Sequence, residues 1–155
     1  MPVLSAGLLM CRFFEEKLQF FLIHPGGPFY SKKDKGVWSI PKGIIENDEE
    51  LFPAAKREFK EETGLDPNGE FHALGSIKSK SGKIVHVWTF LGSWDEKSGI
   101  VSNTFPMEWP PRSGRTIQVP EADRAAWLNF EQACDVINPA QIPLLERAKK
   151  VYSEK

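Results

Sequence analysis

The chain has little cysteine and almost no net charge, and it lacks any long hydrophobic run. Its only cysteines, Cys11 and Cys134, are too few for a disulfide framework, so we expect free thiols in a reducing cytosol. The net charge of −1 argues against a strong nucleic-acid surface or an anionic membrane as partner. No segment approaches the ~20 apolar residues of a membrane span, and the N-terminal residues lack the basic lead of a signal peptide. These absences favour a cytoplasmic protein.

What is present indicates one folded domain over residues 1–155. Hydrophobic residues make up 41% of the chain and five are tryptophan, enough for a packed core. We expect strands over residues 4–14, 18–24, 37–40, 71–78, 83–94 and 125–128. Residues 95–123 are rich in proline and glycine and predict an irregular loop that is functional or mobile. Two helices, over residues 130–137 and 142–152, should cover the sheet face opposite the helix described next.

The most informative stretch is a predicted helix that carries clustered glutamates. It should begin near Leu51, because Pro53 is tolerated in the first turn, and end at Gly64. Its apolar residues recur every four positions and should pack on the sheet. Its last turns carry Glu58, Glu61 and Glu62, whose i, i+3 and i+4 spacing places them on one face.

Three carboxylates at a helix C-terminus repel one another at the end where negative charge is least stable. A cation among them would resolve this conflict. Because the candidate ligands are all oxygen atoms, with no neighbouring histidine or cysteine, the pattern favours Mg²⁺ or Mn²⁺. The alternative is a solvated charged face, which is the usual explanation of a charge run. Arg57 can reach Glu61 or Glu49 and would partly neutralise the cluster.

The spacing of this stretch resembles the signature of the Nudix hydrolase family. Gly43 is followed after five residues by Glu49, and after seven more by the run Arg57–Leu65. This matches Gly-x5-Glu-x7-Arg-Glu-U-x-Glu-Glu-x-Gly-U, with U apolar, at every specified position. The resemblance implies an α+β fold, an α/β/α sandwich with a mixed β-sheet. It also implies hydrolysis of a nucleoside diphosphate linked to another moiety, with Mg²⁺ or Mn²⁺ as cofactor.

The resemblance also assigns roles to residues. Glu61 and Glu62 would be metal ligands, Glu58 a ligand or the general base, and Arg57 would orient Glu58. The Gly43 carbonyl would join the metal shell. Because a further carboxylate from a downstream loop often joins the metals in this family, Glu108 and Glu121 are candidates.

The substrate is predicted less directly. The lead Trp38-Ser39-Ile40-Pro41-Lys42-Gly43 is similar to that of Nudix hydrolases acting on dinucleoside polyphosphates, in which Lys42 would face the phosphates. The proline and tyrosine that mark two family subgroups, for ADP-ribose and for dinucleoside polyphosphates, are absent from the window around residues 80–83. Other candidate substrate-binding residues are Lys80, Lys83, His86, Trp109 and Arg112. Trp38 is either a stacking platform for a base or part of the core.

We therefore expect a pyrophosphohydrolase of a small-molecule nucleotide, with a dinucleoside polyphosphate or related nucleotide as the first choice of substrate. A nucleoside triphosphate pyrophosphatase is the alternative enzyme. The alternative of another class is a nucleotide-binding sensor without turnover, although such a protein would be expected to lose some of the glutamates. The sequence leaves the oligomeric state, the number of metals and the identity of the general base open.

Overall fold

A six-stranded mixed sheet forms the centre of the protein, whose computed structural model describes residues 3–153. The strands run in the order β4-β5-β1-β2-β8, and β3 pairs with the first residues of β1. Strands β1 and β5 are parallel and all other pairs are antiparallel. The strands are β1 (Leu4–Phe14), β2 (Lys17–Pro25), β3 (Lys42–Ile44), β4 (His72–Lys78), β5 (Ile84–Leu91) and β8 (Ala122–Leu128).

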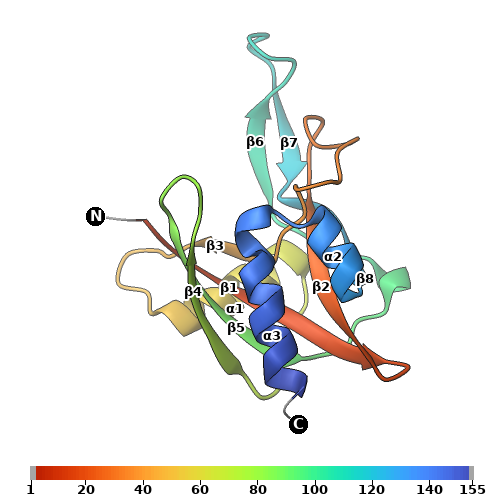
Figure 1. Cartoon of the computed structure of the whole chain (residues 1–155). Coiled ribbons are helices and arrows are strands. Elements are labelled where there is room, and N and C mark those ends of the chain that lie inside the picture. Colours follow the sequence, from red (N-terminus) through yellow and green to blue (C-terminus); the bar gives the residue numbers. More distant parts are fainter. Residues whose placement is uncertain (1–2, 154–155) are drawn as a thin grey trace.

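Helices cover both faces of this sheet (Figure 1). Helix α1 (Leu51–Thr63) lies on one face, while α2 (Phe130–Val136), η2 (Pro139–Gln141) and α3 (Ile142–Ser153) lie on the other. Successive side chains of β1 point to opposite faces of the sheet, so the core has two parts. Leu8 and Met10 pack on the α1 side, and Leu9 and Cys11 pack on the α3 side. The predicted α/β/α sandwich with a mixed sheet is thereby confirmed.

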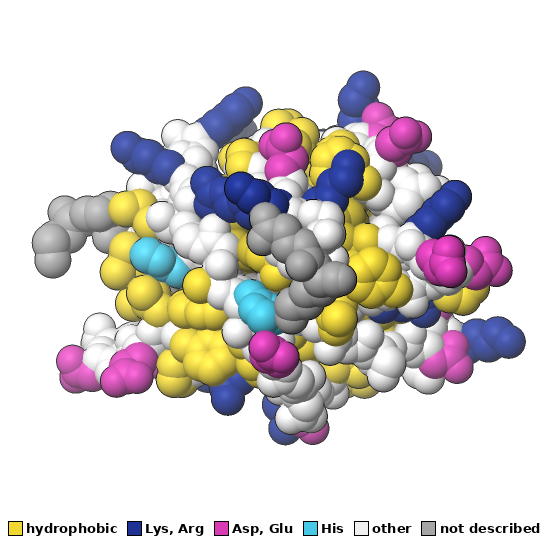
Figure 2. Space-filling view, turned by 60° about the horizontal axis from the view of Figure 1, so that its bottom comes forward, with side chains coloured by type: hydrophobic (Ala, Val, Ile, Leu, Met, Phe, Trp, Pro, Cys, Tyr) yellow, Lys and Arg dark blue, Asp and Glu magenta, His cyan; other side chains and the backbone are white. Residues whose placement is uncertain are grey.

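Strand directions bring several distant segments to one end of the sheet, here called the β3 end. β1 and β5 begin there, β2 and β4 finish there, and β3 pairs with Ser5–Gly7. The loop over residues 26–36, the turn over 79–82 and the start of β8 therefore lie at this end, uppermost in Figure 1. Figure 2 shows the opposite end, where hydrophobic side chains form much of the surface and charges lie mainly toward the rim.

The structure corrects three predicted elements. Within residues 95–123, expected to be irregular, lie a short 3-10 helix, η1 (Glu96–Ser98), and a two-stranded ribbon, β6 (Thr104–Glu108) and β7 (Thr116–Pro120). The ribbon was not predicted because both strands contain a proline. Proline lacks an N–H group and is therefore found mainly in edge strands, so its presence argued against a strand here. Residues 37–40 make only isolated bridges, and the last strand begins three residues earlier than predicted. None of the helices within residues 3–153 combines the length and apolar character that a bilayer crossing requires.

Candidate active site

Helix α1 presents its glutamates toward the β3 end because its other face is fixed in the core. Ala55 and Phe59 are fully buried against the sheet, and Phe59 packs on Phe21 and Phe90. The helix ends at Gly64, whose left-handed conformation (φ 79°) directs its N–H to the Lys60 carbonyl. With its apolar face and its C-terminal end fixed, the helix gives the glutamates of its last two turns a defined orientation.

An extended segment joins the C-terminus of α1 and places a fourth glutamate beside it. Asn103 N donates to the Glu61 carbonyl at 2.7 Å, and Val101 N donates to the Thr63 carbonyl at 2.9 Å. These bonds satisfy carbonyls that have no partner within the helix. Asn103 then accepts from Glu121 N at 2.9 Å, so Glu121 lies next to the cluster. Backbone contacts of this kind have no side-chain signature, and the sequence did not indicate the role of residues 101–103.

Arg57 pairs with several of the carboxylates around α1. Its guanidinium bonds Glu49 through two nitrogens at 2.7 and 2.8 Å. The same side chain donates from Nη1 to Glu58 Oε1 at 2.9 Å and to Glu61 Oε2 at 3.0 Å. This pairing lowers the pKa of Glu49 to about 2 and raises the pKa of Arg57. The predicted contacts of Arg57 with Glu49, Glu58 and Glu61 are all present.

Glu62 is in a very different environment from its neighbour Glu61. Its side chain is buried, the residue being 7% exposed, and its Oε2 atom has no hydrogen-bond partner among the described residues. Burial raises the pKa of Glu62 well above its ordinary value, and the nearby charges of Glu58 and Glu121 raise it further, while Lys42 lowers it. A buried, unpartnered carboxylate oxygen is unfavourable unless a proton or a cation compensates it.

Glu58 and Glu121 share this environment to a lesser degree. Burial raises the pKa of Glu58, and the hydrogen bond from Arg57 opposes this effect. Burial also raises the pKa of Glu121, to which the charge of Glu61 adds. Three carboxyl groups with raised pKa values thus lie at one place in the fold, a pattern typical of functional sites.

Gly43 allows β3 to approach these carboxylates closely. A Cβ atom at this position would overlap the carboxyl group of Glu58, so no larger residue fits without displacing it. The Gly43 backbone therefore lies against the cluster, as its predicted contribution to a metal site requires. Lys42 precedes it, and the charge and the backbone N–H of Lys42 both lower the pKa of Glu62.

The residues present fit a divalent cation, although they do not form a closed cage. Within residues 3–153, no three His, Cys, Asp or Glu side chains converge tightly enough to be a preformed metal centre. Arg57 occupies one oxygen of Glu58 and one of Glu61 in this arrangement. The unpartnered Glu62 Oε2 and the all-oxygen donor set suit a hard cation such as Mg²⁺ or Mn²⁺.

Two predicted site residues lie elsewhere. Glu108 is at the outer end of β6, where its carboxylate accepts a hydrogen bond from Arg112 N at 2.9 Å. It pairs with Thr116, about 17 Å along β7 from Glu121, so it is not part of the cluster. Trp38 is 7% exposed in the core, and its indole N–H donates to Asp34 at 3.0 Å. Its prediction as a stacking platform was wrong, and the core alternative is correct.

The remaining predicted substrate-binding residues surround the β3 end without contacting the glutamates. Lys80 and Lys83 are exposed in the turn between β4 and β5. His86 is half-buried on β5, opposite Ala6 of β1. Trp109 and Arg112 lie at the outer end of the β6–β7 ribbon. The fold places these residues at the same end of the sheet as Lys42.

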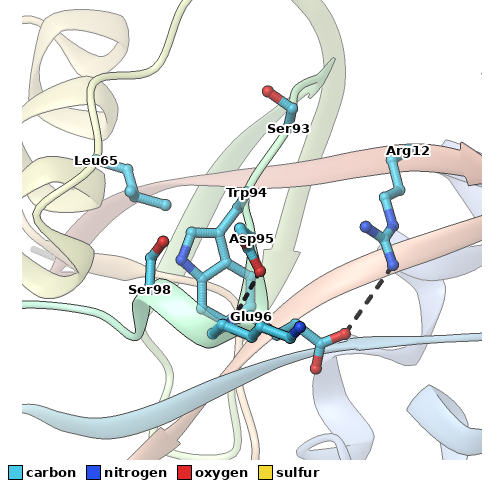
Figure 3. A pocket seen from close by; sticks show the side chains of 8 residues that line it. Arg12, Leu65, Ser93, Trp94, Asp95, Glu96 and Ser98 are labelled. Atoms are coloured by element: carbon cyan, nitrogen blue, oxygen red, sulfur yellow. Dashed lines mark hydrogen bonds and ion pairs between the residues drawn. The ribbon is translucent and has the colours of Figure 1, made fainter.

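A cavity of about 800 Å³, which none of the clustered glutamates lines, lies near the ends of β1 and β5 (Figure 3). Trp94, Leu65 and the η1 residues line it, and Arg12 and Glu96 approach to 4.0 Å at its mouth. Arg12 is further engaged by Gln19 at 2.8 Å and by the Trp127 ring at 4.5 Å. Because Arg12 and Glu96 in its lining already have partners within the protein, this cavity does not indicate a ligand class.

Comparison with known proteins agrees with the geometry. A stretch of 31 residues is 58% identical to Nudix hydrolase 10 of Arabidopsis thaliana, but it covers 20% of this chain and only 11% of that protein. The NUDIX domain of Shewanella oneidensis NrtR, solved with ADP-ribose, has a TM-score of 0.66 and 16% identity, covering 98% of this chain and 89% of that one.

A C. elegans Ap4A hydrolase, solved as a binary complex, has a TM-score of 0.62 and 22% identity and covers 99% of both chains. At these identities the structural neighbours establish the fold alone. The family model described as NUDIX domain matches residues 1–152, almost the whole chain. This protein therefore belongs to the NUDIX family.

Proposed function

We propose that this protein is a divalent-metal-dependent pyrophosphohydrolase that cleaves a nucleoside diphosphate linked to another moiety. The observation that carries the proposal is the buried Glu62 carboxylate, which has an unpartnered oxygen and lies near Glu58 and Glu121. A fold that buries carboxylates together needs protons or a cation to compensate their charge, and a bound cation would do so while keeping the carboxylates ionised. Pyrophosphate is densely anionic and needs the same compensation before a nucleophile can approach.

The groups that would hold Mg²⁺ or Mn²⁺ are the carboxylates of Glu61, Glu62 and Glu121 and the Gly43 carbonyl, and Glu58 would be either a further ligand or the general base. The bound cation would supply positive charge beside the phosphate oxygens and make water more acidic. Arg57 would give up its contact with Glu61 while keeping its two bonds to Glu49 and its bond to Glu58 Oε1. Its role is to position the helix carboxylates.

The protein must also accept a proton from the attacking water. Glu58 suits this task because burial raises its pKa and Arg57 fixes its carboxylate through Oε1. Its Oε2 atom is then the proposed proton acceptor. Glu121 is the second candidate, since it shares the raised pKa but lacks an orienting hydrogen bond of the Arg57 kind among the described contacts.

Substrate phosphates would lie at the β3 end, between the glutamates and the surrounding cations. Lys42 lies closest to the cluster, as its effect on Glu62 indicates. Lys80, Lys83 and His86 from the neighbouring hairpin would contact phosphates farther along the substrate. We propose a dinucleoside polyphosphate or related nucleotide as substrate, with a nucleoside triphosphate as the alternative.

The chain's organisation supports a single domain, because the two core clusters lie on opposite faces of one sheet. We further propose that residues 1–155 act as one Nudix domain in a reducing compartment such as the cytosol. Both cysteines are free, and Cys11 is fully buried, where burial raises the pKa of its thiol to about 12. A thiol in this state contributes packing rather than chemistry.

A sensor without turnover is the competing function. Shewanella oneidensis NrtR, which has also been solved with a 27mer DNA, has a TM-score of 0.62 and 18% identity to this chain. Diadenosine polyphosphates, ADP-ribose and canonical or oxidised nucleoside triphosphates should each be incubated with Mg²⁺ or Mn²⁺, and the products separated by chromatography.

The hydrolase predicts that the wild-type protein turns over at least one nucleotide and that Glu62→Gln does so about 100-fold or more slowly. Cleavage of diadenosine tetraphosphate into ATP and AMP would support the preferred substrate, whereas preferred cleavage of triphosphates would favour the alternative. Nucleotide binding without turnover would favour the sensor.

A further inference from the structure

The β6–β7 ribbon has one apolar face and one polar face. Its register pairs Phe105 with Val119 and Met107 with Ile117, and it places Trp109 opposite Arg115. Cross-strand partners lie on the same side of a sheet, so these side chains form one continuous face. Phe105 and Ile117 are 39% and 38% exposed, which is unusual for large hydrophobic side chains. The opposite face carries the side chains of Thr104, Pro106, Glu108, Thr116 and Gln118.

Part of this apolar face packs on the loop that follows β2. Val119 is buried and Met107 is half-buried, and a Cβ atom at Gly27 would lie 2.8 Å from Val119 Cγ1 and 3.8 Å from Met107 Sδ. Phe105 and Ile117 are the exposed residues of the face. Farther out the ribbon projects into solvent (Figure 1). An isolated two-stranded hairpin is only marginally stable in water, so an exposed apolar face is best explained by something that covers it in use.

The ribbon is continuous with the glutamate cluster. β7 ends at Pro120, and the next residue is Glu121. Ile117 lies about 14 Å along the strand from Glu121, a separation that a polyphosphate chain and its ribose can span. The outer end of the ribbon carries Arg112 and Arg115, which suit phosphate oxygens. A ligand that has phosphates at the glutamates can therefore place its far end on this face.

The size of the face decides between two kinds of occupant. It is about 17 Å long and about 10 Å wide, far smaller than the ~800 Å² per partner of a stable protein interface. A flat aromatic base with its sugar fits this footprint. Phenylalanine and tryptophan side chains stack on bases of any sequence.

We propose that the apolar face of the β6–β7 ribbon binds the nucleoside at the far end of the substrate, beyond the pyrophosphate that is cleaved. This inference rests on the proposed function. It makes a nucleotide with two nucleosides the preferred substrate, because a simple triphosphate has nothing to place on the ribbon.

The test compares two substrates that differ only in the second nucleoside, diadenosine tetraphosphate and adenosine tetraphosphate. Phe105→Thr and Ile117→Thr remove the apolar contact while placing threonine, which suits a β-strand, in each strand. Thr116→Ala on the opposite face is the matched control, and Phe105→Tyr keeps an aromatic ring. In both threonine variants we expect kcat/KM for the dinucleotide to fall about tenfold or more, because KM rises. For adenosine tetraphosphate, kcat/KM of both threonine variants should stay within twofold of the wild-type value. Phe105→Tyr should retain the wild-type preference for the dinucleotide over adenosine tetraphosphate.

Calorimetric binding with Ca²⁺ in place of Mg²⁺ separates this inference from the proposed function. If the wild type binds the dinucleotide with Ca²⁺ but does not hydrolyse it with Mg²⁺ or Mn²⁺, and the threonine variants bind it more weakly, the hydrolase proposal fails and the ribbon site stands. Equal effects on both substrates, or no effect on either, would overturn the ribbon site. A wild-type dimer that the threonine variants convert to a monomer would also overturn it, because the face would then bind a second copy.

Discussion

Two adjacent glutamates of α1 have opposite surroundings. The Glu61 side chain is 37% exposed and bonds Arg57, whereas Glu62 is buried with one oxygen unpartnered. Successive helix residues point about 100° apart, which is enough to carry one side chain from the rim of the site to its floor. Because the buried charge is the one that most needs compensation, Glu62 should dominate cation binding.

Replacing Glu62 with glutamine should therefore separate activity from stability. Glu62→Gln should lower hydrolysis about 100-fold or more, because an amide is a poor substitute for a charged ligand. The same change should raise the stability of the metal-free protein at pH 8 by about 1–3 kcal/mol, since it removes an uncompensated buried charge. Turnover assays and thermal unfolding in EDTA measure the two effects. Glu50→Gln, at an exposed position beside α1, is the charge-matched control, and equal stability changes in both variants would contradict this account.

The downstream carboxylates give a second comparison. Glu121 lies in the cluster, and Glu108 bonds the Arg112 backbone in the ribbon. Glu121→Gln should lower kcat by about 10–100-fold, while Glu108→Gln should stay within twofold of the wild type. Steady-state kinetics with a common substrate would measure both. A larger loss in Glu108→Gln than in Glu121→Gln would show that the ribbon, rather than the start of β8, supplies the additional carboxylate.

Among the helices and strands, those with a regular apolar pattern or a clear terminal residue could be predicted from the sequence. Those that depend on backbone contacts with distant residues could not. Helix α1 begins at Leu51 and stops at Gly64 as expected, because Pro53 and Gly64 restrict the backbone locally. β3 and the ribbon were missed. β3 has only three residues, and the ribbon contains prolines, so neither produces a clear alternating pattern. The glutamate cluster was predictable from spacing, whereas the selection of Glu121 over Glu108 depends on the path of residues 101–103.

The close approach of β3 to α1 leads to a third prediction. Gly43→Ala should place a methyl group in the space of the Glu58 carboxylate. Displacing a catalytic group by about 1 Å can lower a rate about 100-fold, so activity should fall by that order and the melting temperature should also drop. Ile44→Ala, which shortens an exposed side chain on the same strand, should leave kcat unchanged. Wild-type turnover by Gly43→Ala would mean that β3 lies farther from the catalytic carboxylate.

For the whole molecule, the site makes stability depend on pH in two directions. Glu49 has a pKa of about 2 in the fold against an ordinary 4.5, so its pairing with Arg57 stabilises the fold above pH 4.5 and is lost as pH falls toward 2. Glu62 has a raised pKa, so the folded state holds its proton more tightly than the unfolded chain does. Its contribution is therefore present below pH 4.5 and is lost as pH rises through the folded pKa.

We accordingly expect the melting temperature of the metal-free wild type, relative to Glu62→Gln, to fall as pH is raised from 4.5 to 8. Added Mg²⁺ should reverse this fall in the wild type, because a ligand that binds only the folded state stabilises it. Scanning calorimetry at several pH values, with EDTA or with Mg²⁺, would show both effects. A difference between the two proteins that does not change with pH would contradict the assigned burial of Glu62.

The central claim is that the glutamates of α1, together with Glu121, hold a divalent cation. Titration of Mn²⁺ monitored by electron paramagnetic resonance tests it directly, because free and bound Mn²⁺ give distinct signals. The wild type and Glu50→Gln should both bind Mn²⁺ saturably, and Glu62→Gln should bind it at least 10-fold more weakly. Equal Mn²⁺ affinity in the wild type and Glu62→Gln, or no binding by the wild type, would contradict the claim.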